Sequence, residues 1–233
     1  MNKKDQTLIR IGLTENHPCS YLKEQQERVA VVMDEQLHSN AGYELLMANG
    51  FRRSGNTIYK PQCDECQACQ SLRVNLNGYK PSKSHKRLIA KAQDIEWEMK
   101  TEMDADWFEL YQKYICKRHR SGTMYPPKEK EFAEFAQNHW LNTQFLHVYQ
   151  AEKLIAIAVT DVMSNCASAF YTFFDPDCDF SLGTLCVLLQ IAFCKQNGKQ
   201  WLYLGYQIDN CSAMSYKVRF QPHQKLVNQK WQG

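Results

Sequence analysis

The chain has 233 residues, of which 44% are hydrophobic and 23% are charged, and its formal net charge at pH 7 is +3. A chain of this length folds into one large domain or two small ones, and the near-neutral total charge excludes a polycation. The sequence has no run of about 18 apolar residues, which a membrane span needs, and its first residues lack the apolar core of a signal peptide. We therefore expect a cytoplasmic protein without a membrane partner, whose ten cysteines are reduced thiols.

The first 78 residues predict a small, turn-rich α/β domain. The expected elements are a short apolar-alternating piece over 8–13, a strand over 28–33, a helix over 39–49 that ends at Gly50, a hairpin over 51–59 and a strand over 71–76. A basic connecting segment, residues 79–103, links this domain to the rest of the chain.

Residues 104–233 predict a second domain. Helical spacing of apolar residues predicts helices over 104–120 and 128–140, and three strands are expected over 144–150, 154–162 and 167–174. A long apolar helix over 182–196, a strand over 201–204, a short helix over 213–218 and a last strand over 225–230 complete the domain. This order is that of the GNAT acyltransferase fold. The predicted fold class is therefore α/β (α+β), with a small cysteine-bearing domain followed by a GNAT-like domain.

The loop before the long helix bears on the cofactor. In GNAT acyltransferases this loop carries several glycines whose amides bind the pyrophosphate of acetyl-CoA, but residues 179–186 contain one glycine and no basic residue. The glycine-rich motifs of ATP- and NAD-binding proteins are absent from the sequence as well. We therefore expect a reaction that requires no cofactor.

Three cysteines at three-residue intervals stand out in the N-terminal domain. Cys63, Cys66 and Cys69, joined by Cys19, supply four sulfurs, enough for a closed tetrahedral site. The run begins like the bacterial ferredoxin ligand pattern but lacks its last step. Two interpretations stay open: a zinc or Fe–S site, and a cluster of reduced thiols that holds the loop by packing.

Basic residues gather in two places. The first group is Lys83, Lys86, Arg87 and Lys91, and the second contains Arg118 and Arg120. Local basic patches on a near-neutral protein favour a phosphate-backbone partner, although a solvated helix face would have the same composition.

Several short motifs resemble, in the same order, those of the bacterial aminoacyl-tRNA–protein transferases. They are Pro18–Leu22, Gly50–Gly55, Tyr59–Pro61 with the cysteine run, Met124–Pro127, Ala158–Asp161, Tyr171–Asp177, Ser181–Gly183 and Tyr203–Tyr206. The resemblance covers the chain from about residue 8 onward. It implies transfer of leucine from leucyl-tRNA to proteins with N-terminal Asp or Glu, the first step of N-end rule degradation. Eukaryotic relatives transfer arginine and carry a Cys-x-x-Cys pair where this chain has Cys19 and Leu22, which favours the leucine branch.

Such a reaction is the aminolysis of an activated ester by an α-amine. It needs positioning, removal of one proton and stabilisation of an oxyanion, and no covalent enzyme intermediate. The candidate catalytic residues are Asp161, Tyr171, Asp175 and Tyr206. A buried structural role for Asp161 and a turn for Asp175 are the alternatives.

Binding of the two substrates makes further demands. A forked cation is suited to the acidic side chain of the acceptor, and Arg52, Arg53 and Arg73 are the candidates, with an internal salt bridge as the alternative. Further substrate-binding candidates are Tyr125, Phe174, Ser181 and Gly183, and the two basic groups are the candidate tRNA contacts.

Three other functions are compatible with parts of the pattern. The donor could be arginyl-tRNA, the enzyme could be an acetyl-CoA-dependent N-acetyltransferase, or the chain could be a non-catalytic RNA- or metal-binding module. The last alternative leaves the aromatic and acidic motifs of the second domain without a role.

Overall fold

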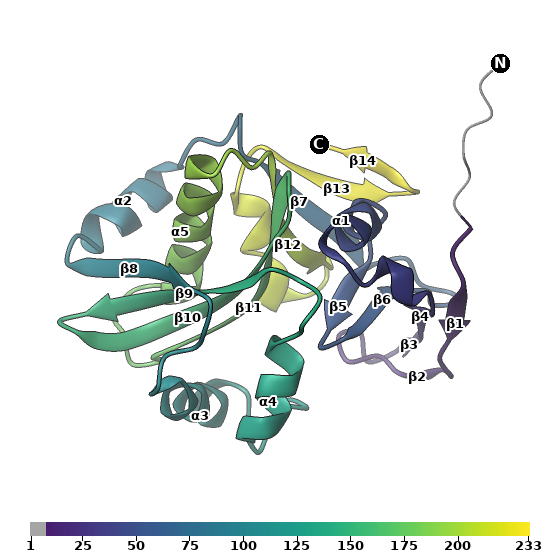
Figure 1. Cartoon of the computed structure of the whole chain (residues 1–233), viewed down its shortest axis with the longest axis horizontal. Helices are drawn as coiled ribbons and strands as arrows, with labels where there is room; N and C mark the ends of the chain where they lie inside the picture. Colours follow the sequence, from purple (N-terminus) through teal and green to yellow (C-terminus); the bar gives the residue numbers. More distant parts are fainter. Residues whose placement is uncertain (1–7) are drawn as a thin grey trace.

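The computed structural model describes residues 8–233. Its main element is an eight-stranded sheet that is antiparallel except between β11 and β12 (Figure 1). In spatial order the strands are β14 (Lys230–Gln232), β13 (His223–Val227), β7 (Gln70–Asn75), β12 (Trp201–Gln207), β11 (Cys166–Phe174), β10 (Lys153–Val162), β9 (Thr143–Gln150) and β8 (Ile95–Lys100).

Helices cover both faces of this sheet (Figure 1). On one face lie α2 (Lys83–Lys91) and α5 (Leu182–Gln196), and on the other lie α3 (Trp107–Arg118) and α4 (Glu129–Ala136). Because both faces are covered, β10 is buried from Leu154 to Val162 and reads as a continuous apolar run rather than an alternating one. No helix in the described part of the chain is long and apolar enough to cross a membrane.

A smaller unit packs beside the large sheet. It contains a four-stranded sheet in the order β1 (Ile11–Leu13), β4 (Val29–Val32), β6 (Thr57–Pro61), β5 (Arg52–Ser54), a two-stranded sheet of β2 (His17–Pro18) and β3 (Gln26–Glu27), η1 (Glu35–Leu37) and α1 (Asn40–Ala48). Ser39 caps α1 by accepting a hydrogen bond from the Gly42 amide. Tyr43 and Leu46 of α1 pack against Tyr203 of β12, so one hydrophobic cluster joins the unit to the large sheet.

The elements form largely where the sequence predicts them, but their assignment to units differs. The strand expected over 71–76 forms as β7 and pairs with β12 and β13 of the large sheet. The expected connecting segment contributes α2 and the edge strand β8. The predicted divisions after residues 78 and 103 therefore do not coincide with the boundary between the two sheets.

Smaller differences have local causes. The strand expected over 225–230 is a hairpin of β13 and β14, because Asn228 and Gln229 adopt left-handed conformations with φ of 49° and 59°. The helix expected over 213–218 forms as two 3-10 turns, η2 (Ser212–Met214) and η3 (Lys217–Arg219). The helix expected over 128–140 ends at Ala136, and Gln137 is already extended.

A buried ion pair ties the smaller unit to the large sheet. Arg53 of β5 donates to both carboxylate oxygens of Asp161 at the end of β10, over 2.9 and 2.7 Å, and both side chains are 0% exposed. Thr143 donates to the same carboxylate, and the guanidinium lies 3.8 Å above the centre of the Phe170 ring. The geometry thus favours the structural interpretation of both residues. Asp161 is not placed to accept a proton from a substrate, and Arg53 is not free to bind the carboxylate of a substrate.

We predict that Asp161→Asn destabilises the protein by about 3–5 kcal/mol, because Arg53 would remain buried without a counter-charge. The double variant Arg53→Met, Asp161→Leu removes both charges and is expected to unfold at a higher urea concentration than the single variant. Urea denaturation measures both.

The matched control is Asp34→Asn, which breaks the pair between Asp34 and Arg10, whose side chain is 81% exposed. An exposed pair of this kind contributes less than about 1 kcal/mol. Equal effects of the buried and exposed substitutions would contradict the anchoring role of Asp161.

Candidate active site and its relatives

The two parallel strands of the large sheet separate after a short pairing. β11 and β12 pair only through Cys166–Ser168 and Trp201–Tyr203. Beyond these residues β11 continues to Phe174 and the start of α5, whereas β12 continues to Gln207 beside the smaller unit (Figure 1). Crevices at the carboxyl ends of parallel strands are the usual ligand sites of α/β sheets. The two sides of this opening differ in their residues.

The β12 side holds a pocket of about 660 Å³ between the smaller unit and the large sheet. Its lining includes Tyr59 of β6, Ser71 of β7 and Tyr206 of β12, together with the cysteine loop. Elements from both parts of the chain therefore build its wall. A concave site with a mixed polar and apolar lining is the expected form of a substrate pocket.

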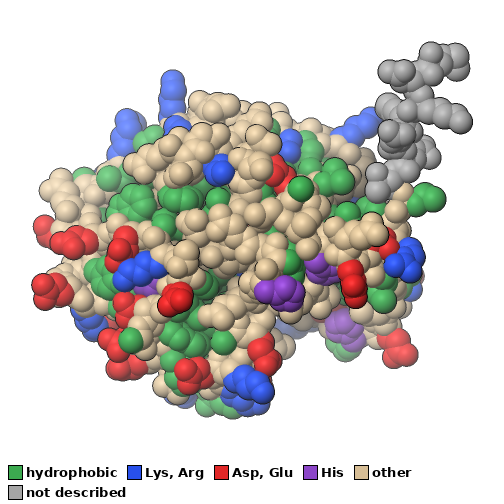
Figure 2. Space-filling model, in the orientation of Figure 1, with side chains coloured by type: hydrophobic (Ala, Val, Ile, Leu, Met, Phe, Trp, Pro, Cys, Tyr) green, Lys and Arg blue, Asp and Glu red, His purple; other side chains and the backbone are tan. Residues whose placement is uncertain are grey.

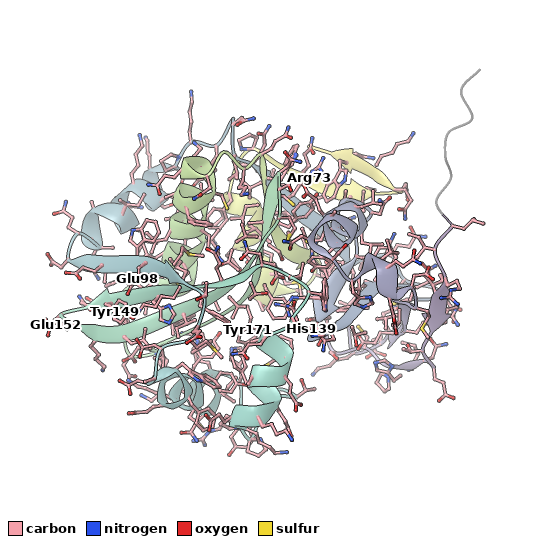
Figure 3. All side chains as sticks on the ribbon, in the orientation of Figure 1. Arg73, Glu98, His139, Tyr149, Glu152 and Tyr171 are labelled. Carbon is pink, nitrogen blue, oxygen red and sulfur yellow. The ribbon has the colours of Figure 1, made fainter. Side chains whose placement is uncertain are left out.

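Arg73 does not reach this pocket as a free cation. Its guanidinium is stacked between Trp201 and Trp231, with 3.8 and 4.0 Å to the ring centres, and it donates to the Gln224 side chain over 3.0 and 2.8 Å. Figure 3 places Arg73 at the β7 side of the sheet, away from Tyr171. Its contacts therefore indicate a structural clamp rather than a carboxylate-binding role.

Arg52 differs from the other two arginines because it contacts no carboxylate among the described residues. It is 6% exposed, donates to the Ser71 hydroxyl over 2.7 Å and to the Phe51 carbonyl over 3.2 Å, and its buried Nε has no partner. The rings of Tyr203 and Tyr206 flank the guanidinium at 5.1 and 5.7 Å. Of the three predicted arginines, Arg52 alone is a buried cation without a counter-ion, directly behind a pocket wall.

The two candidate catalytic tyrosines are both half-buried. Tyr206 donates to the Gly50 carbonyl over 2.8 Å, and burial raises its pKa well above the ordinary value. Tyr171 packs between Phe132 and Phe135, and burial also raises its pKa. Neither phenol therefore ionises near neutral pH, and any contribution to the reaction is limited to hydrogen bonding or stacking.

Asp175 lies at the end of β11 and is tied down by lysines. Lys113 Nζ lies 2.6 Å and Lys153 Nζ 3.5 Å from its carboxylate, which also accepts from the Asp177 amide. Burial raises the pKa of Asp175, but the hydrogen bonds from Lys113 and the Asp177 amide outweigh it and leave the pKa below its usual value. The geometry favours the turn interpretation over that of a proton acceptor.

Three of the other predicted substrate-binding residues, Phe174, Ser181 and Gly183, lie at the α5 side of the opening, and Tyr125 does not. A Cβ on Gly183 would lie 3.3 Å from the Phe174 ring, so glycine allows this strand end to pack against α5. The Ser181 hydroxyl donates to Thr184 in the first turn of α5. Tyr125 lies in the loop between α3 and α4 and is 44% exposed, so it is not part of this group.

The two basic groups stand on either side of the loop that precedes α5. Lys83, Lys86 and Arg87 are exposed on α2, and Lys91 at its end pairs with Asp179 over 2.9 Å. Figure 2 shows Lys and Arg side chains at the upper left, over the region of α2. On the other side, Arg118 lies 5.5 Å above the Phe174 ring, and Arg120 is exposed just beyond α3. The loop over 175–181 therefore lies between two groups of cations.

All four predicted metal ligands, Cys19, Cys63, Cys66 and Cys69, line the 660 Å³ pocket. Burial and the neighbouring cysteines raise the pKa of Cys69 to about 12, and the Cys63 thiol donates to the Arg28 carbonyl. Within residues 8–233, no three His, Cys, Asp or Glu side chains are arranged to hold a metal ion. The sulfurs are thus brought to one place but, as placed here, do not form a ligand set.

Two residues in the sequence-predicted regions have roles that the sequence did not indicate. His85, inside the first basic group, is 3% exposed and is hydrogen-bonded to the Tyr79 hydroxyl, so it anchors α2 to the core. Lys217 of η3 is 9% exposed and donates to the Tyr206 carbonyl over 2.5 Å. The only sequence signal for Lys217 is its place between apolar residues, Tyr216 and Val218.

Comparisons with known proteins agree over both parts of the chain. A family model described as the N terminus of arginine-tRNA-protein transferase matches residues 17–87, and one described as its C terminus matches residues 106–227. Aspartate/glutamate leucyltransferase of Vibrio parahaemolyticus is 65% identical, and the alignment covers 97% of each chain. The protein of the same name from Pseudoalteromonas atlantica is 45% identical over 96% of this chain and 97% of its own.

Solved structures share the fold at low identity. The C-terminal domain of a putative lysylphosphatidylglycerol synthetase from Agrobacterium fabrum aligns with a TM-score of 0.51 and 11% identity, over 93% of this chain and 82% of that one. L-PGS from Bacillus licheniformis aligns with the same TM-score and 10% identity, over 78% of this chain and 60% of that one. Two matching family models and full-length relatives of high identity place the chain in the arginine-tRNA-protein transferase family.

Proposed function

We propose that the chain transfers leucine from leucyl-tRNA to the α-amine of proteins that begin with Asp or Glu, and thereby marks them for N-end rule degradation. The observation that carries this proposal is the 62–65% identity, over 97% of the chain, to proteins named aspartate/glutamate leucyltransferase. The setting would be the cytoplasm, where charged tRNA is available.

The chemistry is direct aminolysis. The acceptor nitrogen forms a bond to the carbonyl carbon of the leucyl ester, the ester C–O bond breaks, and the amine proton ends on the released ribose hydroxyl. The energy of the ester drives the reaction, so neither a nucleotide nor a covalent enzyme intermediate is needed. Because Asp161 and Asp175 are held by cations, the protein would contribute mainly by positioning the two substrates.

The arrangement around β11 and β12 supports a GNAT-like site for this step. The short parallel pairing, the divergence of the strands and the long helix α5 that follows β11 fit that fold. The leucyl ester would lie at the opening between the strand ends. Phe174, Ser181 and Gly183 would lie on its α5 side, and the pocket beside Tyr206 on its β12 side.

The acceptor stem of the tRNA would lie across the loop before α5. Lys83, Lys86 and Arg87 on α2 and Arg118 and Arg120 near the end of α3 supply exposed cations on both sides of it. Lys91 belongs to the same surface, because its pair with Asp179 is exposed and weak. Such contacts position the RNA through its phosphates and carry no base-specific information.

The donor can be tested directly. Purified protein, an Asp-initiated peptide and labelled leucyl-tRNA should give a leucyl-peptide, whereas labelled arginyl-tRNA should give little product. An Ala-initiated peptide serves as the control acceptor. Transfer of arginine alone would reject the leucine assignment, and transfer from acetyl-CoA would indicate an N-acetyltransferase.

The tRNA surface makes a second prediction. Reversal of Lys86 and Arg87 to Glu should weaken leucyl-tRNA binding and make the slope of log K against log salt shallower by about 2, because two phosphate contacts are lost. The matched control reverses Lys130 and Lys230, which are exposed on α4 and β14. If both double variants change the slope equally, the effect is one of net charge and the contact surface lies elsewhere.

The metal interpretation of the cysteine loop stays a prediction. A Zn²⁺ ion or Fe–S cluster bound by Cys19, Cys63, Cys66 and Cys69 would be structural, since no step of aminolysis needs it. Protein purified without oxygen should then carry about one equivalent of zinc or a stoichiometric cluster, and Cys66→Ser should lose it. Cys116→Ser, at a thiol outside the loop, is the control. Metal-free protein with full activity would exclude the site.

A further inference from the structure

Two buried cations of this structure have no acidic partner. The buried charged residues are Arg52, Arg53, Asp161, Asp175 and Lys217, beside His85 and His147. Arg53 and Asp161 pair with each other, and Asp175 pairs with Lys113. In the described part of the chain only Arg52 and Lys217 are buried and charged without a counter-ion. An unpaired buried charge is costly, so its presence indicates a ligand of opposite charge.

The two cations, from β5 and η3, contact the same residue of β12, Tyr206. Arg52 stacks on the Tyr206 ring at 5.7 Å, and Lys217 donates to the Tyr206 carbonyl over 2.5 Å. Gly205 beside them has φ of +84°, and a Cβ there would lie 3.5 Å from Lys217 Nζ. The backbone at this point thus takes a conformation that favours glycine, and the ammonium group lies within van der Waals range of the Cβ position.

The pKa of Lys217 agrees with the short distance between the two cations. Burial and then the charge of Arg52 lower the pKa of Lys217 to about 8. Cys211 and Cys69 act in the opposite direction, and neither is a carboxylate. Lys217 is still mostly protonated at neutral pH, so the site carries close to two positive charges.

Both cations lie behind the wall of the 660 Å³ pocket: neither side chain lines it, but each donates to a residue that does. Ser71, which accepts a hydrogen bond from Arg52, and Tyr206, whose carbonyl accepts from Lys217, both line it. The Ser71 hydroxyl keeps its own proton and can donate it to an anion in the pocket. A pocket of about 660 Å³ admits the end of a polypeptide but not an RNA stem.

We propose that Arg52 and Lys217, acting with Ser71, form the site that holds the side-chain carboxylate of the acceptor's N-terminal Asp or Glu. The inference rests on the proposed function and names the residues that select its acceptor. An acidic side chain neutralises the two cations, whereas a neutral isostere such as Asn leaves them buried and unpaired. Sites of this kind reject the wrong substrate strongly, because binding it leaves buried polar groups of the protein without hydrogen-bond or charge partners, which is unfavourable in free energy.

The test compares acceptor selectivity. Leucyl transfer is measured for Asp- and Asn-initiated peptides of otherwise equal sequence, with wild-type protein, Lys217→Met and Arg52→Met. Each variant is expected to reduce the ratio of kcat/KM for Asp over Asn at least about tenfold, through a higher KM for the Asp peptide. The KM for leucyl-tRNA is expected to stay unchanged. Lys217→Arg keeps the charge and is expected to retain much of the selectivity.

Lys199→Met is the matched control. Lys199 also donates to the carbonyl of a buried residue, Met163 just after β10, over 2.7 Å, but neither Met163 nor its other acceptor, Ser164, lines the pocket. It should leave the ratio unchanged. Thermal denaturation distinguishes a structural role: Lys217→Met removes an unpaired buried charge together with the hydrogen bond to the Tyr206 carbonyl, two opposing effects, so its melting temperature is expected to stay near that of wild type.

Several results would overturn the proposal. One is an equal loss for both peptides with an unchanged ratio, which would indicate a structural role. Another is a higher KM for leucyl-tRNA alone, which would assign the cations to the donor. If the wild-type protein transfers no leucine, the proposed function fails. Binding of a fluorescent Asp-initiated peptide then still tests the site, and equal affinity for Asp and Asn peptides would reject it.

Discussion

The buried pair of Arg53 and Asp161 fixes the smaller unit on the large sheet, and the candidate acceptor site depends on that placement. The pair joins β5 to the end of β10 with two hydrogen bonds and no exposed atoms in either side chain. Hydrogen bonds with this geometry allow little rotation or sliding between the two units. Arg52, the preceding residue of β5, is therefore held at a defined position against Ser71 of β7. Arg53 thus anchors the two units, and the neighbouring Arg52 is available to interact with a ligand.

The opening between β11 and β12 has different electrostatics on its two sides. On the α5 side the cations are exposed and numerous, and the acidic residues of the loop over 175–181 are already paired with lysines. On the β12 side the pocket lining includes Lys60, Glu27 and Arg28, which pairs with Asp64. By contrast, Arg52 and Lys217 behind its wall are buried and have no acidic partner among the described residues. Exposed charges bind a flexible polyanion weakly and with strong salt dependence, whereas buried charges discriminate between side chains. This division matches the two substrates of the proposed reaction, an RNA and a polypeptide end.

Sequence patterns predicted the elements better than their partners. The helix over 182–196 and the strand over 154–162 follow from local apolar runs, which long-range contacts do not alter. The strand over 71–76 was also predicted, but nothing local indicates that it pairs with β12, about 130 residues later in the chain. The boundary between the two sheets depends on that pairing, so it could not be placed from the sequence alone.

The candidate site shows the same limit at the level of single residues. The sequence selected Arg52, Arg53 and Arg73 as a group, because forked cations in matching motifs look alike. Only their contacts distinguish them. Arg53 pairs with Asp161, and Arg73 stacks between two tryptophans and donates to Gln224, whereas Arg52 has no acidic partner among the described residues. Lys217 lies in the run Lys-Val-Arg, which is typical of a solvated turn, and its burial arises only when η3 packs against β12.

The two carboxylates at the ends of β10 and β11, Asp161 and Asp175, are both held by cations, which is consistent with the demands of the chemistry. An α-amine has an ordinary pKa near 8, so an appreciable fraction is already neutral and nucleophilic at pH 7.5. Nearby positive charge disfavours the ammonium form further, and Arg52 and Lys217 supply such charge beside the acceptor pocket. The cations that select an acidic side chain would therefore also favour the reactive form of the amine next to it. A dedicated base would then add little. The one carboxylate that lines the described pocket, Glu27, already accepts hydrogen bonds from Ser20 and lies within hydrogen-bond distance of His17.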